Sequence, residues 1–416
     1  MQTIGLKTKQ KNIALGILFL TWVLVSFNKI AITVAIIPMT KEFNLTPYQI
    51  GLIMSSFFFC YAVMSLIAGV ATNKARHWSI MTKIMMLWTG LNIATAAAWN
   101  FICLLVLRSM HGAAGGLLGP LGAVTIAEVF PKEERGRAQS FLVSGTVLGT
   151  GVGGLVTAVI IANFNWRMAF LLFGLLGAVF TILFCVFIGD HMSDAAAGVQ
   201  PDNTSSITAV IQVPLVLQLG LISLGAGVAN WGLTSWLPSY WVNIQGVSMV
   251  NMGVLTVIPA IIMFVFMQIS GVVLDKLMVK FEKYVLFCST LCVVVLMYLM
   301  MDAVDIPEAV AYLSLTFMMM AFITSTIFVL PQKHLPIQMI GSATGLIIFM
   351  HLIGGSIAPT IMGFLIAKHS GSYSPAFMFV AMMILMSAAV SLTINTKVDF
   401  GKVKDEQNVK YVRYKN

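Results

Sequence analysis

Charged side chains are scarce in this sequence. They make up 9% of its 416 residues, whereas hydrophobic residues make up 59%. An average soluble domain has about 25% charged residues, so the composition excludes an ordinary soluble protein and indicates a membrane protein. The first apolar run, residues 13–38, is too long for the apolar core of a cleavable signal peptide. We therefore expect it to remain as a spanning helix.

Cysteine is also sparse. The five cysteines all lie in apolar runs, they lack the spacing of a metal site, and their odd number argues against a disulfide framework. We interpret them as packing residues and expect no metal or other cofactor. The sequence also lacks a His-x-x-x-His motif and paired carboxylates within the apolar runs. Because an intramembrane enzyme needs such a set at one depth, we expect no enzymatic activity.

Apolar runs long enough to cross a membrane dominate the rest of the chain. A spanning helix needs roughly 20 apolar residues. Twelve such runs are present, at 13–38, 48–72, 79–99, 101–128, 137–163, 167–188, 213–241, 250–274, 284–301, 308–330, 340–367 and 374–395. We predict an all-α membrane protein of twelve transmembrane helices in two six-helix halves, 1–188 and 213–396. The polar stretch 189–212 would link them, and a basic tail, 397–416, would follow.

Lysine and arginine are distributed unevenly between the two sides of this arrangement. If the N-terminus is cytoplasmic, 19 of the 24 basic residues fall in cytoplasmic segments and 3 in outer segments. Basic residues concentrate on the cytoplasmic side of membrane proteins, so we expect both termini there. The net charge of +9 is then a topology signal that faces anionic lipid, and nucleic-acid binding is not expected. The short loops favour a bacterial plasma membrane, and we expect a monomer.

Acidic residues are missing at the depth at which two basic residues occur. Lys29 lies nine residues from the outer end of its run and Arg108 seven, which places them about 13 Å and 10 Å deep at 1.5 Å per residue. A cation in the membrane is costly without a partner and often marks a substrate site. We expect both side chains to converge on one cavity and to bind an anionic group. The alternative is that they snorkel to the outer interface, which suits Arg108 better than Lys29.

Two segments at equivalent places in the halves are alike. Residues 69–74 end the second run and residues 271–276 end the eighth, as expected for parallel repeats. Both resemble the loop motif Gly-x-Leu-Ala-Asp-Arg-x-Gly-Arg of the major facilitator superfamily. Asp275 and Lys276 keep this motif, and Asn73 departs from it. The resemblance implies the twelve-helix fold and transport by alternating access.

Within that superfamily the chain resembles the anion:cation symporters, which take up sugar acids and other organic anions. The resembling segments are 27–35, 130–138, 165–170 and 236–240. The resemblance implies proton-coupled uptake of a small organic anion.

Two carboxylates of the family pattern are absent from this chain. Asn28 stands where the family has Asp, and Gly115 stands where it often has a Glu implicated in proton coupling. Histidine is the remaining side chain that titrates near neutral pH, so His111 and His351 are the candidates for carrying a proton. Either could instead bind substrate or hydrogen-bond a neighbouring helix.

Further polar and aromatic residues are expected to contact the substrate. With the two cations, they are Asn28, Tyr61, Asn230, Trp236, Tyr240 and Gln268. The aromatic residues Trp236 and Tyr240 could instead be interface anchors, and the amides could bridge helices. A cytoplasmic salt-bridge gate is expected from Glu128, Arg135, Arg76, Asp275 and Lys276, with ordinary positive-inside charge as the alternative.

Three other functions stay open at this point. One is an exchanger of organic phosphate or other anions. Another is a drug or metabolite exporter, suggested by the glycine-rich stretch 149–154, although two buried cations argue against cationic cargo. The third is a membrane receptor that does not transport.

Overall fold

The computed structural model describes residues 8–71, 77–130, 132–189, 210–274, 281–335 and 337–394. These residues form twelve long α-helices, one π-helical turn and no β-strand. The N-terminal half contains α1 (Thr8–Phe43), α2 (Pro47–Ala71), α3 (His77–Ala96), α4 (Phe101–Val129), α5 (Lys132–Asn163), α6 (Trp166–Phe184) and the turn η1 (Cys185–Gly189). The C-terminal half contains α8 (Pro214–Asn243), α9 (Met249–Val272), α10 (Glu282–Met301), α11 (Ile306–His334), α12 (Ile337–Lys368) and α13 (Ser374–Leu392).

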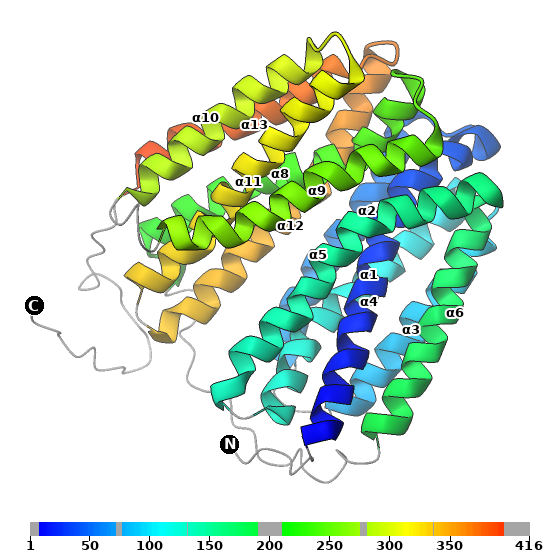
Figure 1. Ribbon diagram of the computed structural model, residues 1–416, viewed down its shortest axis with the longest axis vertical. Helices are drawn as coiled ribbons and strands as arrows, with labels where there is room; N and C mark the ends of the chain where they lie inside the picture. The colour runs from blue at the N-terminus through cyan, green and yellow to red at the C-terminus, as the bar shows by residue number, and fades with distance from the viewer. Residues whose placement is uncertain are drawn as a thin grey trace, which may run out of the picture.

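The two halves are separate helical bundles that lie side by side (Figure 1). We call the end of the molecule at which α1 begins the near end, and the opposite end, where α1 ends at Phe43, the far end. In Figure 1 the near end is at the bottom, and the two bundles diverge toward it. They come together toward the far end, so the contacts between the halves are concentrated there.

The helices have the length and apolarity of membrane spans. Eleven of those in the described ranges are long and apolar enough to cross a membrane. The remaining long helix, α3, carries buried polar residues, among them Thr89, Asn92 and Thr95, which lower its hydropathy. It packs against α4 and α6. The predicted all-α membrane fold is confirmed, whereas most of the predicted linker, 189–212, lies outside the described residues.

Polar caps start four of the helices at the far end. The side chains of Asn100, Asn165, Ser248 and Asp305 each accept a hydrogen bond of 2.8–3.3 Å from a backbone N–H three residues later. The first N–H groups of a helix have no partner within the helix, so such a cap stabilises its start. These caps mark the beginnings of α4, α6, α9 and α11.

The halves approach each other most closely along α2 and α12. A Cβ atom at Gly51 of α2 would overlap the backbone of Pro359 in α12, and one at Gly363 of α12 would overlap the backbone of Pro47. Glycine is therefore required at both positions for this close packing, as is common between membrane helices. We call this contact the α2–α12 seam.

Further contacts between the halves continue from the seam toward the middle of the bundle. The Oγ of Ser55 accepts a hydrogen bond of 3.1 Å from the N–H of Thr360. The rings of Phe58 and Trp231 have centroids 4.5 Å apart. On the other side of the bundle, Gly253 of α9 fits against α5.

Candidate functional site

A cavity of about 530 Å³ lies between the two halves. Its walls come from α1 and α5 on one side and from α8, α9 and α11 on the other. Among the described residues, no charged side chain lines it, and its polar side-chain groups are the hydroxyls of Thr33, Thr150, Thr234 and Thr256. The rest of the lining is apolar and includes Ile30, Val34, Leu237, Pro259, Ala260 and Phe317. The sequence predicted a central cavity but not these lining residues, because each of them is ordinary for a membrane helix.

Most of the threonine hydroxyls in the central cavity already use their donor. Those of Thr33, Thr150 and Thr256 each donate a hydrogen bond of 2.8 Å to a backbone carbonyl of their own helix. A hydroxyl has a single O–H donor, so these three groups can offer a ligand acceptor lone pairs only. The cavity is therefore poor in hydrogen-bond donors.

Lys29 lies on α1 beside residues that line the central cavity, but it is not itself one of the lining residues. It precedes the lining residue Ile30, and it lies four residues before Thr33, which places both on one face of the helix. The side chain is half-buried, and its Nζ lies 4.8 Å from the centroid of the Tyr61 ring on α2. No carboxylate pairs with Lys29 among the residues that the structure describes.

Arg108 is buried inside the N-terminal half. Its side chain is 1% exposed, its Nη1 donates a hydrogen bond of 3.2 Å to Oδ1 of Asn28, and its guanidinium carbon lies 4.6 Å from the centroid of the Phe57 ring. Within the described ranges, its Nε has no hydrogen-bond partner and no carboxylate pairs with it.

The structure does not bring Lys29 and Arg108 together in one cavity, contrary to the expectation. Asn28 and Lys29 are consecutive in α1, so their side chains point about 100° apart. Asn28 turns toward Arg108, and Lys29 turns toward Tyr61. The rings of Phe57 and Tyr61, with centroids 5.9 Å apart, each contact one of the two cations. Snorkelling of Arg108 to the interface is also excluded here by its burial.

Arg108 belongs to a buried polar cluster that joins α1, α3 and α4. Asn28 Nδ2 donates to Oδ1 of Asn92, and Asn92 Nδ2 donates to the backbone carbonyl of Trp88 at 3.1 Å. The same amide nitrogen lies 3.3 Å from Nε2 of His111, so it donates there as well. His111 is 0% exposed, and its ring meets that of Trp88 edge-on at 5.3 Å.

The hydrogen bonds of this cluster determine the tautomer of His111. An amide NH₂ can only donate, so Nε2 of His111 is the acceptor and the proton of the neutral ring is on Nδ1. That Nδ1 has no hydrogen-bond partner in the described part of the chain. With Arg108 one helical turn away, a second positive charge on His111 is disfavoured in this conformation.

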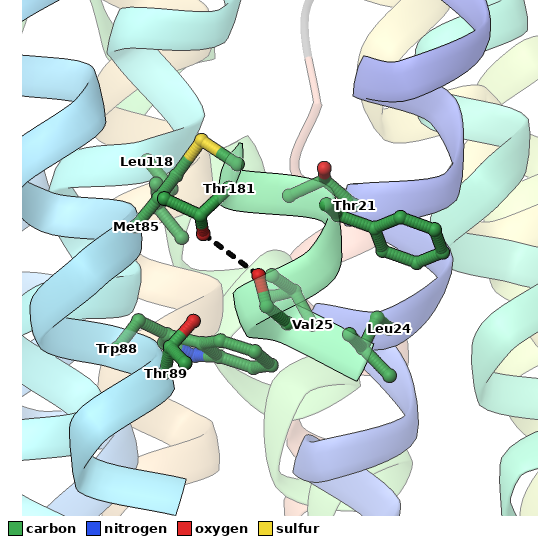
Figure 2. A pocket seen from close by; sticks show the side chains of 10 residues that line it. Thr21, Leu24, Val25, Met85, Trp88, Thr89, Leu118 and Thr181 are labelled. Atoms are coloured by element: carbon green, nitrogen blue, oxygen red, sulfur yellow. Dashed lines mark hydrogen bonds between the residues drawn. The ribbon is translucent and has the colours of Figure 1, made fainter. Parts of the chain in front are cut away.

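A smaller cavity of about 240 Å³ lies wholly inside the N-terminal half. Figure 2 shows Thr21, Leu24 and Val25 of α1 on one side of it and Met85, Trp88 and Thr89 of α3 on another. The hydrogen bond drawn there is that of Thr181 to the carbonyl of Gly177, at 2.7 Å. The described residues that line it include no charged side chain, and its place away from the interface between the halves marks it as packing space.

Comparison with known proteins gives the family. The model of the Major Facilitator Superfamily matches residues 18–359. The chain belongs to the major facilitator superfamily. Members of this superfamily are transporters and not enzymes, so the sequence-based expectations on the fold and on the absence of enzymatic activity are confirmed.

Several relatives within the superfamily are named for anions. A hexuronate transporter of Bacillus subtilis is 25% identical over 386 residues, which cover 89% of this chain and 91% of the relative. A probable sulfoacetate transporter of Cupriavidus necator is 26% identical, with 94% and 95% covered. A chloroplastic ascorbate transporter of Arabidopsis thaliana is 27% identical over 62% of this chain and 51% of its own.

Solved structures show the same superfamily fold. A bacterial homolog of the human lysosomal transporter Spinster, in an inward-facing and unoccupied conformation, matches with a TM-score of 0.77 at 15% identity, covering 93% of this chain and 97% of its own. The nucleoside transporter NupG matches with a TM-score of 0.74 at 13% identity, covering 92% and 99%.

The second candidate histidine, His351 on α12, bridges α12 to α8 within the C-terminal half. It is half-buried, and its Nδ1 lies 3.2 Å from the backbone carbonyl of Ser223 on α8. A carbonyl can only accept, so Nδ1 is the donor in this bond. The structure thus places His351 in the role of a helix-bridging residue and gives it no contact with the Arg108 cluster.

Trp236 and Tyr240 are buried in aromatic packing near the far end. The Nε1 of Trp236 donates to the carbonyl of Pro359 at 3.1 Å, and the OH of Tyr240 accepts a hydrogen bond of 2.9 Å from Gln245. Both rings contact Tyr373 of the same half. They stabilise the C-terminal half behind the α2–α12 seam and do not line the central cavity.

The two amide candidates lie outside the cavity lining as well. Asn230 is half-buried on α8, and Gln268 is exposed on α9. Of the predicted gate, Arg76, Asp275 and Lys276 lie outside the described residues, as do the side chains of Glu128 and Arg135. The gate therefore remains a prediction.

Two ion pairs were not anticipated from the sequence. At the far end, Glu42 of α1 pairs with Arg167 of α6 at 2.6 Å and accepts a hydrogen bond of 2.7 Å from Trp166 Nε1. At the near end of the C-terminal half, Lys333 pairs with the buried Glu282 at 3.3 Å. Both pairs tie helices together within one half, so they stabilise each half as a unit.

Proposed function

We propose that this member of the superfamily carries a small organic anion, a sugar acid or a similar carboxylate, across the bacterial plasma membrane, and that Lys29 binds its anionic group. The observation that carries the proposal is a half-buried lysine, next on α1 to the lining residues Ile30 and Thr33, with no carboxylate partner in the described ranges. Apolar surroundings strengthen the attraction between such a cation and an anion. The relatives named for hexuronate and sulfoacetate support an anionic cargo.

Transport would proceed by alternating access of the two halves. The contacts between halves given by Gly51, Ser55, Phe58 and Gly253 lie between the far end and the middle of the bundle. The distribution of basic residues in the sequence places the near end in the cytoplasm. On that assignment the structure is inward-facing, and opening toward the outside requires the α2–α12 seam to separate while the near end closes.

Arg108 would act on the anion from inside the N-terminal half. It contacts Phe57, whose ring packs beside that of Tyr61, and Tyr61 in turn contacts Lys29. A buried cation without a counter-charge adds to the positive potential on the Lys29 side of these rings. In this conformation Arg108 therefore attracts the cargo without touching it.

Coupling to protons would involve His111 in preference to His351. His111 shares the cluster of Asn28 and Asn92 with Arg108, so its charge state affects the potential at the site. In the present conformation the cluster holds it neutral, so protonation would accompany a rearrangement of α1 against α3 and α4. His351 has no contact with this cluster.

Exchange of one organic anion for another is the second candidate function. It is favoured by the absence of a carboxylate at Asn28 and Gly115, the two positions where the resembling symporters have one. An exchanger needs a cationic site but no titrating group. Such a protein would catalyse counterflow without responding to a pH gradient.

The test is counterflow of labelled glucuronate or sulfoacetate into proteoliposomes. Lys29→Gln should lower the rate about 10- to 100-fold, because a hydrogen bond to a charged group contributes about 1.5–3 kcal/mol. Lys83→Gln, which removes an exposed lysine on α3, is the matched control and should transport normally. Wild-type rates in Lys29→Gln would refute the proposal, and an imposed pH gradient that changes net uptake would separate symport from exchange.

A further inference from the structure

The accessible charge at the central cavity is a single positive one. Among the described residues, Lys29 is the half-buried cation next to its lining residues on α1, whereas Arg108 is 1% exposed behind Phe57. The cavity lining itself carries no charge. A ligand with one anionic group can be neutralised here, and a second anionic group on the same ligand would find no accessible partner.

Lys29 and residues of the cavity lining are neighbours along α1. Lys29 lies one helical turn before Thr33 on α1, and Trp231 lies about one turn before Thr234 on α8. Trp231 and Tyr61 belong to the same apolar cluster across the interface between the halves. Beyond the lining, toward the near end, therefore lie one lysine and aromatic rings, of which Trp231 carries an Nε1–H without a hydrogen-bond partner among the described residues.

The cavity is poorly suited to a polyhydroxylated body. Three of its four threonine hydroxyls donate to their own helices, so the O–H groups of a sugar would find acceptors but its oxygens would find few donors. The remaining walls are apolar. A hydroxyl added to a ligand in an apolar pocket lowers binding by up to about 100-fold when no partner receives it.

We infer that the cargo is a monocarboxylate with an apolar ring or chain and few hydroxyls, whose carboxylate contacts Lys29 and whose apolar body occupies the cavity at Thr33 and Ala260. This inference rests on the proposed function, anion transport at Lys29, and narrows its substrate class away from sugar acids. The aromatic rings of Tyr61 and Trp231 favour a flat or cyclic body next to the carboxylate.

Cyclohexanecarboxylate and glucuronate are a suitable pair of probes, because both have a six-membered ring with one carboxylate and they differ mainly in hydroxyls. Binding to the purified full chain is read from the rise of the thermal unfolding midpoint with ligand concentration. Binding is preferred to uptake because uncharged weak acids cross lipid unaided. We expect cyclohexanecarboxylate to bind at least tenfold more tightly than glucuronate, and more tightly than cyclohexane-1,2-dicarboxylate.

Two variants on α9 test the place of the apolar body. Ala260→Leu fills part of the cavity and should weaken the binding of cyclohexanecarboxylate at least tenfold. The affinity for acetate, which needs only Lys29, should not change. Ile261→Leu, at the neighbouring position that is 56% exposed, is the control and should bind like the wild type. An equal affinity for glucuronate and cyclohexanecarboxylate, or no effect of Ala260→Leu, would overturn the inference.

The neutral probe cyclohexanecarboxamide separates this inference from the proposed function. If the amide binds as tightly as the acid, or if Lys29→Gln binds the acid normally, the anion site itself is refuted. If instead glucuronate or sulfoacetate binds in a Lys29-dependent way and cyclohexanecarboxylate does not, the anion site stands and the apolar cargo is refuted.

Discussion

The α2–α12 seam gives a sharp test of alternating access through the substitution Gly363→Ala. A Cβ atom at Gly363 would lie 3.0 Å from the carbonyl carbon of Pro47 and 3.0 Å from Cζ2 of Trp236, whereas ordinary contact begins at 3.4 Å. The neighbour across the seam is the backbone of Pro47, which cannot turn away, whereas Trp236 belongs to the same half as Gly363. The two helices must therefore separate by several tenths of an ångström wherever the far end is closed.

The cost of this separation falls on one conformation. Overpacking of a well-packed contact costs about 1–3 kcal/mol. Because the seam is apart when the far end is open, that conformation does not bear the part of the cost that comes from Pro47, whereas the contact with Trp236 is present in both conformations. The equilibrium should then shift toward an open far end by about 5- to 150-fold.

Distances between spin labels across the far end would measure the shift. Labels at Tyr48, which is 44% exposed, and at the exposed Ser372 span the seam in a variant whose five cysteines are replaced by serine. Gly363→Ala should populate a longer distance. Gly345→Ala, on the same helix and with no atom within 4 Å of its added Cβ, controls for helix propensity. An unchanged distribution in Gly363→Ala, or the same change in Gly345→Ala, would refute the reasoning.

Further outcomes are expected at the buried cluster and the ion pairs. Arg108→Met should leave the free energy of unfolding unchanged or raise it by about 1–4 kcal/mol, because it removes a buried unpaired charge, while counterflow falls; a large loss of stability would contradict this. His111→Gln should remove the pH dependence of uptake and leave exchange unchanged. His351→Gln should keep the pH profile of uptake and lower the free energy of unfolding by about 1 kcal/mol, because its hydrogen bond to Ser223 is lost. A retained pH profile in both variants would exclude a histidine as the proton carrier. Glu42→Gln should lower stability by about 1 kcal/mol or less in thermal unfolding, since the pair is 39% exposed at Glu42, and a larger loss would show that the pair acts with Trp166 as a unit.

The helices could be predicted because their signals are local. The run expected at 101–128 is observed as Phe101–Val129, starting after the cap Asn100. The first helix is longer than expected, Thr8–Phe43 instead of 13–38, and continues through Pro38. Membrane helices tolerate proline because surrounding groups satisfy the freed backbone, so a proline is a weak stop signal there.

The site could be predicted only in part. The identities of the two cations and the lack of acidic partners follow from composition and depth. The directions of Lys29 and Arg108 do not, because the rotation of each helix about its axis is set by packing against other helices. The residues that line the central cavity could not be predicted for a similar reason: they come from five helices that contribute only apolar or hydroxyl side chains.

Because Asn28 and Lys29 are consecutive, a rotation of α1 moves both side chains at once. One peptide bond joins the amide that holds Arg108 to the ammonium that faces Tyr61. A helix turns as a rigid rod, so any twist that draws the ammonium toward a visiting acid also rotates the amide relative to the guanidinium. Binding of an anion at Lys29 would then change the contact between Asn28 and the buried Arg108. This coupling needs one peptide bond and no long chain of side-chain contacts.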